Sequence, residues 1–348
     1  MKKTVIIVSI FLMFFVFVSV AIFGVQPVYA KAKLLRLVVS SPAGDWPLTY
    51  SNEELAKRFN KRANGEYIIE VHAGGALAKI PEYFDAVRIG AIEMACSAWP
   101  MFSFLDPRLG ITELPFLFTS SPATSASCKP LLPLYDQILQ EKFNAKGLGI
   151  MNVGGMQLWS TKPIKTLEEW KGVLIGAISP PAAGMIKALG GSPVTIMWTD
   201  LYESLQKKVI DATCLNTHAA LVMSVPQVCK NLTIFYGISS WQAFSINLDI
   251  WKKMPKNIQQ ILLEEAAAIC EMMNEITDTK LGKDDVKKFK DMGVKVYILP
   301  KYERDRWEKK LNPIKEKEFA SFGEFSQKVK KIADDVNSRY PYSEEGLY

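Results

Sequence analysis

The chain has 348 residues, and 49% of them are hydrophobic, which excludes a disordered protein and gives enough length for two ordinary domains. Its net charge is +6, but the basic residues are scattered among acidic ones with no aromatic residues interleaved. This pattern is typical of a solvated surface, so we expect no nucleic-acid partner.

The N-terminus has the pattern of an export signal. Lys2 and Lys3 precede a nearly unbroken apolar run over residues 5–23, and Val28-Tyr29-Ala30 offers small residues where a signal peptidase cleaves. We therefore expect residues 1–30 to be a signal peptide and the mature protein to be periplasmic. The run of about twenty apolar residues exceeds the usual core of about 7–15, so an uncleaved N-terminal membrane anchor stays open.

Two stretches of the chain show the same order of elements, βαβαβ. In the first, we expect strands at 34–39, 67–71 and 92–98, with helices at 49–63 and 81–90. In the second, we expect strands at 173–178, 194–197 and from 209 onward, with helices at 180–190 and from 199 to 206. This order predicts largely parallel sheets, whose ligands bind beyond the carboxyl ends of the strands. In the second stretch those ends are Ser179, Trp198 and Asn216.

Several motifs within and around these stretches resemble those of one family. They are Trp170-Lys171-Gly172, Leu189-Gly190-Gly191-Ser192-Pro193, Leu205-Gln206, Val209-Ile210-Asp211 and Leu114-Pro115-Phe116-Leu117-Phe118. Over about residues 33–300 the chain resembles the periplasmic solute-binding proteins of tripartite ATP-independent periplasmic (TRAP) transporters, the DctP type.

The resemblance implies an α/β, two-lobe periplasmic-binding-protein-like fold, in which each lobe is a mostly parallel sheet flanked by helices and a cleft lies between the lobes. It implies crossings between lobes near Gly154 and Phe244. Lobe one would then be residues 31–154 plus 244–282, and lobe two 155–243 plus 283–330. Residues 331–348 would form the end of the C-terminal helix and a tail.

The implied function is capture of a small organic solute in the cleft and its delivery to the TRAP membrane permease subunits. The binding protein of an ATP-driven uptake system, a ligand-sensing ectodomain and an enzyme on the same scaffold stay open as alternatives. The chain has only two histidines, His72 and His218, and no nucleotide-binding, nucleophile-elbow or zinc-protease motif. We therefore expect no catalytic residues, no cofactor and no metal, and the oligomeric state is left undetermined.

Aromatic residues at strand ends are the first candidates for ligand contact. Trp46, Trp99 and Trp198 follow expected strands, and in the family the position of Trp198 is usually a Phe that packs on the ligand. Packing in the core is the alternative for each of these tryptophans. Further candidates are the following residues: Trp159, Trp241, Leu215, Asn216 and His218.

The chain departs from the family where a ligand carboxylate would be held. The family uses the planar fork of an arginine for this purpose, and the two matching positions are Gly176 and Gln157. We therefore expect free space at Gly176 and a ligand that is aromatic or cyclic, and neutral or weakly acidic. Four cations are possible substitutes for the missing arginines: Lys79, Arg88, Arg108 and Lys162.

Overall fold

The computed structural model describes residues 32–197 and 200–344. The described strands are β1 (Lys33–Val39), β2 (Tyr67–Ala73), β3 (Met94–Ser97), β4 (Ala145–Ser160), β5 (Leu174–Ala177), β6 (Ser192–Thr195), β7 (Ala212–Leu215), β8 (Asn231–Asn247) and β9 (Lys295–Ile298). The described α-helices are α2 (Leu48–Arg62), α3 (Tyr83–Arg88), α4 (Ser121–Phe143), α5 (Pro180–Leu189), α6 (Leu201–Gln206), α7 (Thr217–Val222), α8 (Val225–Val228), α9 (Leu248–Lys253), α10 (Lys256–Ile276), α11 (Gly282–Asp291), α12 (Lys301–Ser321) and α13 (Gly323–Arg339).

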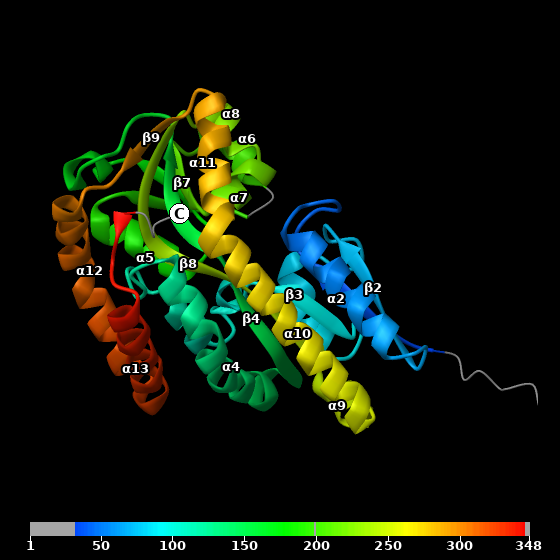
Figure 1. Cartoon of the computed structure of the whole chain (residues 1–348). Helices are drawn as coiled ribbons and strands as arrows, with labels where there is room; N and C mark the ends of the chain where they lie inside the picture. Colours follow the sequence, from blue (N-terminus) through cyan, green and yellow to red (C-terminus); the bar gives the residue numbers. More distant parts are fainter. Residues whose placement is uncertain (1–31, 198–199, 345–348) are drawn as a thin grey trace, which may run out of the picture.

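The sheet has a parallel group of strands at each end. Its order is β2-β1-β3-β8-β4-β7-β5-β6, and β9 pairs with β8. β1 is parallel to β2 and β3, while β5 is parallel to β6 and β7. The predicted strands are thus present, with ends shifted by a few residues, and the α/β fold with two halves is confirmed. Figure 1 shows the halves as two masses, with β2, β3 and α2 in one and β7, β9 and α5 in the other.

Two long antiparallel strands, β4 and β8, run through both halves. Near its C-terminal end β8 pairs with β3 through Ala243–Ile246, whereas its first residues pair with β9. β4 pairs with β8 along most of its length and with β7 at its C-terminal end. The register between β4 and β8 shifts between Asn152 and Gly155. The lobe boundaries at residues 154 and 244 stay a prediction.

Hydrophobic side chains are buried on both faces of the sheet in each half. Two clusters lie in the half that contains β1–β3, one under α4 and α13 and the other under α2 and α10. Two more lie in the half that contains β5–β7, one under α5 and α12 and the other under α6, α7 and α11. Because both faces of the central strands are covered, β4 and β8 are buried almost throughout.

Capping residues, prolines and glycines in the sequence mark the ends of several helices. Ser179 caps α5 by accepting a hydrogen bond from the N–H of Ala182, and Pro180 and Pro181 occupy the first turn. Gly190 ends the helix with φ 102°, in the left-handed region that glycine tolerates. At the C-terminal end, α12 and α13 follow β9, and Pro313 lies inside α12.

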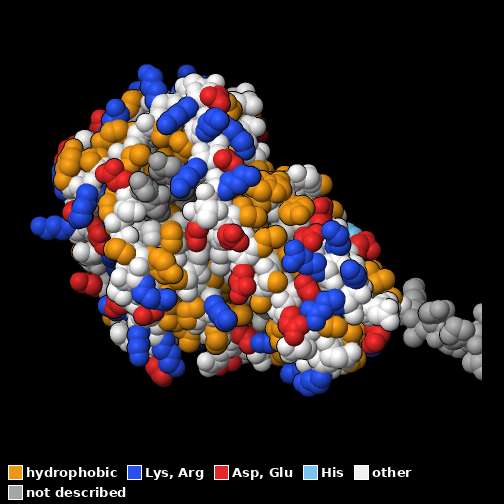
Figure 2. Space-filling view, in the orientation of Figure 1, with side chains coloured by type: hydrophobic (Ala, Val, Ile, Leu, Met, Phe, Trp, Pro, Cys, Tyr) orange, Lys and Arg blue, Asp and Glu red, His pale blue; other side chains and the backbone are white. Residues whose placement is uncertain are grey.

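The surface carries mixed charges. On the face in Figure 2, Lys and Arg side chains lie among Asp and Glu side chains with no large field of one sign. Within residues 32–197 and 200–344, no helix has both the length and the apolar character needed to span a membrane. The predicted signal peptide, residues 1–30, lies outside the described part of the chain.

The close packing of β4 on β8 gives the first prediction. A Cβ at Gly155 would clash with the ring of Tyr236, whose hydroxyl donates to Thr124 and cannot move away freely. Gly155→Ala should therefore lower the free energy of unfolding by about 1–3 kcal/mol, measured by urea denaturation.

Gly184→Ala is the matched control, because a Cβ at this interior position of α5 has no neighbour within 4 Å. It should raise stability by about 0.5–1 kcal/mol through helix propensity. Equal effects of the two substitutions would contradict the packing described for β4 and β8.

Candidate functional site

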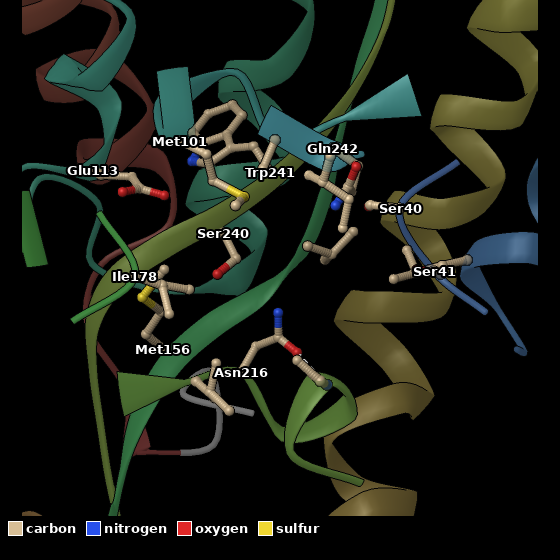
Figure 3. A pocket seen from close by; sticks show the side chains of 16 residues that line it. Ser40, Ser41, Met101, Glu113, Met156, Ile178, Asn216, Ser240, Trp241 and Gln242 are labelled. Carbon is tan, nitrogen blue, oxygen red and sulfur yellow. Dashed lines mark hydrogen bonds between the residues drawn. The ribbon is translucent and has the colours of Figure 1, made fainter. Parts of the chain in front are cut away.

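The carboxyl ends of parallel strands from both halves converge on one pocket, seen from close by in Figure 3. The residues that follow or end these strands and line the pocket are Ser40, Ser41, Ala98, Ile178, Leu215 and Asn216. The middle parts of β4 and β8 add Val153, Met156, Ser240, Trp241 and Gln242. The pocket encloses about 650 Å³ of atom-free space, part of which opens to solvent. Residues of both halves therefore line the same pocket.

Most of the lining is apolar or uncharged. None of the described residues that line the pocket carries a positive charge, and Glu113 is the only carboxylic acid among them. Trp198 and Thr199, which the structure does not describe, are uncharged as well. Among the described residues, the lining therefore offers no cation for a ligand carboxylate.

Glu113 ends the 3₁₀ helix Pro107–Glu113, and its side chain is held at the pocket wall. The residue is 2% exposed, and the hydroxyl of Ser179 donates to its Oε2 over 2.7 Å. Burial raises the pKa of Glu113 to about 7, although the hydrogen bond from Ser179 works in the opposite direction. The Glu113 side chain thus ties the start of α5 to the segment that follows β3.

Asn216 is oriented by its role as the N-cap of α7. Its Oδ1 accepts the backbone N–H of Ala219 over 2.7 Å. The amide nitrogen is therefore turned away from the helix, and Figure 3 shows it pointing into the pocket. On the opposite wall, Trp241 packs against Phe118, with ring centroids 5.5 Å apart and the ring planes tilted by 56°. The indole N–H of Trp241 is buried and has no hydrogen-bond partner among the described residues.

His218 forms a second link between the two halves. Its Nε2 lies 2.7 Å from Oδ1 of Asp45, which follows β1, and both side chains are buried, 9% and 4% exposed respectively. Its Nδ1 lies 3.9 Å from Oδ2 of Asp285, which accepts a hydrogen bond from Thr217. Burial raises the pKa of Asp285, while His218 and Lys288 lower it. His218 is therefore placed beside the pocket and is bonded to protein, and it does not line the pocket.

Of the predicted site residues, the structure brings Leu215, Asn216 and Trp241 together in the pocket wall. Trp198, the strongest candidate from the sequence, lies outside the described residues. The positions of Leu215 and Asn216 follow from the rule that ligands bind beyond the carboxyl ends of parallel strands.

The other tryptophans are placed elsewhere. Trp99 is buried against Tyr135, and Trp159 donates its N–H to the carbonyl of Leu215 and packs edge-on against Phe289. Trp46 is 41% exposed, with the ammonium of Lys280 5.6 Å from its ring. None of these three indoles is part of the described pocket lining, so core or surface packing accounts for each of them.

The expectation of free space at Gly176 is wrong. A Cβ there would lie 2.8 Å from Cδ1 of Ile210 and 3.2 Å from Cδ2 of Leu201, so apolar side chains fill the position. Gln157 has a structural task, because its Oε1 accepts the backbone N–H groups of Phe235 and Tyr236 beside an irregular part of the β4–β8 ladder. Neither residue lines the main pocket.

The four substitute cations also lie elsewhere. Arg88 pairs with Asp85, Arg108 pairs with Asp106, Lys79 is exposed, and Lys162 lines a separate surface hollow. Sequence reasoning missed Glu113, which follows no strand, and Ser240 and Gln242, which lie inside a strand. Ser40 and Ser41 could have been predicted, because they follow the first predicted strand directly and ligands bind beyond the carboxyl ends of parallel strands.

The contact between His218 and Asp45 gives a second prediction. His218→Ala leaves the Asp45 carboxylate buried without this partner, which should cost about 1–3 kcal/mol of folding stability in chemical denaturation. His72→Ala is the control, since Nε2 of His72 contacts the exposed carboxylate of Glu70 and its loss should cost less than about 0.5 kcal/mol. In a double-mutant cycle with Asp45→Ala, additive losses would contradict a direct interaction.

The buried Glu113 gives a third prediction. In an unfolded chain this carboxyl loses its proton near pH 4.5, whereas the folded protein retains it up to about pH 7. Between these values the folded state binds more protons, so the free energy of unfolding should fall as the pH rises. Glu113→Gln should reduce that fall by up to about 3 kcal/mol, measured by urea unfolding at about pH 5 and about pH 8. Identical falls in both proteins would show that Glu113 titrates normally.

Comparison with known proteins places this chain in a family. A family model for bacterial extracellular solute-binding proteins, family 7 (DctP), matches residues 41–321. The C4-dicarboxylate-binding protein DctB of Bacillus subtilis is 23% identical over 282 residues, which cover 78% of each chain. The 2,3-diketo-L-gulonate-binding periplasmic protein YiaO of Escherichia coli is 27% identical over 227 residues, which cover 63% of this chain and 68% of YiaO.

Solved structures share the fold. DctP7 of Bordetella pertussis, an extracytoplasmic solute receptor that binds pyroglutamic acid, superposes with a TM-score of 0.82 at 18% identity and covers 87% of this chain and 100% of its own. A TRAP periplasmic solute-binding protein of Desulfovibrio salexigens with bound orotic acid has a TM-score of 0.78 at 22% identity, over 88% and 99% of the two chains. The chain therefore belongs to the DctP family of extracellular solute-binding proteins, the type that serves TRAP transporters.

Proposed function

We propose that this protein binds a small cyclic or aromatic solute, neutral or weakly acidic, in the pocket between its two halves and delivers it to TRAP permease subunits. The main observation in support of a neutral or weakly acidic ligand is that none of the described lining residues carries a positive charge. A ligand carboxylate in a buried site needs a cation or several donors to replace its hydration. The family's arginine positions hold Gly176 and Gln157, so neither supplies that cation.

The shape and surface of the pocket support a compact ligand with apolar faces. Met101, Met156 and Ile178 line it together with the indole of Trp241, and their side chains offer polarisable, adaptable contact area. Polar side chains are fewer than apolar ones, and hydrogen bonds to protein fix Glu113 and Asn216, as in other sites where a small number of placed polar groups set the orientation of a ligand. Two of the family structures hold the small cyclic compounds pyroglutamic acid and orotic acid, which supports a ring-shaped ligand.

Closure of the two halves on the solute is the proposed mode of binding. Ser179–Glu113 and His218–Asp45 join segments that follow strands of different halves, on two sides of the pocket. A ligand that contacts both halves stabilises the closed conformation, in which these two hydrogen bonds form. The binding protein of an ATP-driven system and a sensing ectodomain are not favoured, because the matched family serves a different transporter type.

A thermal-shift panel tests the ligand class. Aromatic and cyclic compounds that are neutral or carry one carboxylate should raise the melting temperature more than succinate or malate do. Ligand at about a hundredfold excess over its Kd stabilises the fold by about 2.7 kcal/mol. Trp241→Ala should remove the shift, and Trp198→Ala is predicted to weaken it.

Trp46→Ala is the matched control, because this indole is 41% exposed and lies outside the pocket lining. It should retain the full shift. Strong stabilisation by succinate or malate that survives Trp241→Ala would show that the binding site or the ligand class has been misassigned.

A further inference from the structure

The polar groups of the pocket form an incomplete hydrogen-bonding set. Glu113 has one hydrogen bond among the described residues, from Ser179 to Oε2. The Nδ2 of Asn216 points into the pocket, and the indole N–H of Trp241 is buried without a partner in the described part of the chain. In Figure 3 the nitrogen of Trp241 lies on the side of the pocket where Glu113 is drawn. One wall thus offers the Glu113 carboxyl, and Asn216 and Trp241 offer N–H donors. The remaining polar side chains of the described lining, those of Ser40, Ser41, Ser240 and Gln242, can each donate or accept.

A ligand that matches this set needs both kinds of group. A carboxylate can only accept, so it pairs with Glu113 only while Glu113 keeps its proton, and above about pH 7 it meets a second negative charge with no cation among the described lining residues. An ammonium can only donate, so it satisfies Glu113 but leaves the donors of Asn216 and Trp241 unpaired. A buried donor without a partner costs free energy, so neither charged ligand suits the whole pocket.

We propose that the pocket selects an uncharged ligand that presents an N–H to the Glu113 carboxyl and a carbonyl acceptor to Asn216 or Trp241, as a cyclic amide does. This inference rests on the proposed solute-binding function and narrows its ligand class. Glu113 is the specificity-determining residue in this assignment. Burial raises the pKa of the carboxyl to about 7, so an N–H donor from the ligand is well placed to stabilise its ionised form.

A purely structural role is the competing account of Glu113. The hydrogen bond from Ser179 joins the 3₁₀ helix Pro107–Glu113 to the start of α5, and this contact alone favours a polar residue at the position. The two accounts differ in what a substitution does to ligand preference. A structural role changes the stability of the free protein but leaves the ranking of ligands unchanged.

Three compounds of similar shape test the inference by calorimetric titration: phenylacetamide, methyl phenylacetate and phenylacetate. The amide offers an N–H and a carbonyl, the ester only acceptors, and phenylacetate adds a negative charge. The wild-type protein should bind the amide about ten- to a hundredfold more tightly than the ester, and phenylacetate most weakly. In Glu113→Gln, which keeps the size of the side chain and can still accept from Ser179, the preference for the amide over phenylacetate should shrink at least tenfold.

Several results would overturn the inference. One is a wild-type protein that binds the amide no better than the ester, or that binds none of the three. Another is a Glu113→Gln variant that melts at a lower temperature yet ranks the three compounds as the wild type does. If that variant fails to fold, the wild-type ranking and an Asn216→Ala variant still test the inference. Loss of the donor at Asn216 should weaken binding of the amide. Tight binding of phenylacetate overturns this inference but leaves the proposed solute-binding function standing.

Discussion

The pairing of β4 with β8 is the interaction on which the rest of the structure depends. These strands of 16 and 17 residues run antiparallel from one half of the molecule to the other, and each half adds its parallel strands to their free sides. Because the ladder shifts register between Asn152 and Gly155, the strands are irregular where they pass between the halves. Val153, Met156, Ser240 and Trp241 come from this region and line the pocket, so a solute bound there would touch the segments that connect the halves.

The chemistry of the pocket depends on which lining side chains are not already hydrogen-bonded to other parts of the protein. His218 and Gln157 are committed to Asp45 and to the backbone of β8, and Asn216 commits one amide atom to α7. What remains among the described lining residues is a mostly apolar wall with one carboxylic acid, Glu113, and several uncharged polar side chains. Relatives named for C4-dicarboxylates share the fold at low identity, whereas ligand class depends on a few positions that can change without disturbing it.

Elements with strong local signals were predictable from the sequence. The apolar runs of β1 and β5, the capping Ser179 and the terminating Gly190 all act over a few residues, so periodicity and turn chemistry reveal them. The lengths of β4 and β8 were not predictable in this way, because strands buried on both faces show no alternation. The strand-end rule found Leu215 and Asn216, but it missed Glu113, whose place at the pocket depends on long-range packing of the segment after β3. The prediction of free space at Gly176 failed because it also depended on long-range packing. A missing side chain leaves space only if no neighbour fills it, and Ile210 fills it here.

The central claim is that the solute lies between the halves in a pocket whose described lining offers no cation for a carboxylate. Mass spectrometry of the compound released when the protein, purified from cells grown in a complex medium, is denatured tests this most directly. The account predicts a small ring-containing molecule that is neutral or carries one carboxyl group, recovered from the wild type but not from Trp241→Ala. Recovery of a C4 dicarboxylate such as succinate or malate in stoichiometric amount would contradict it.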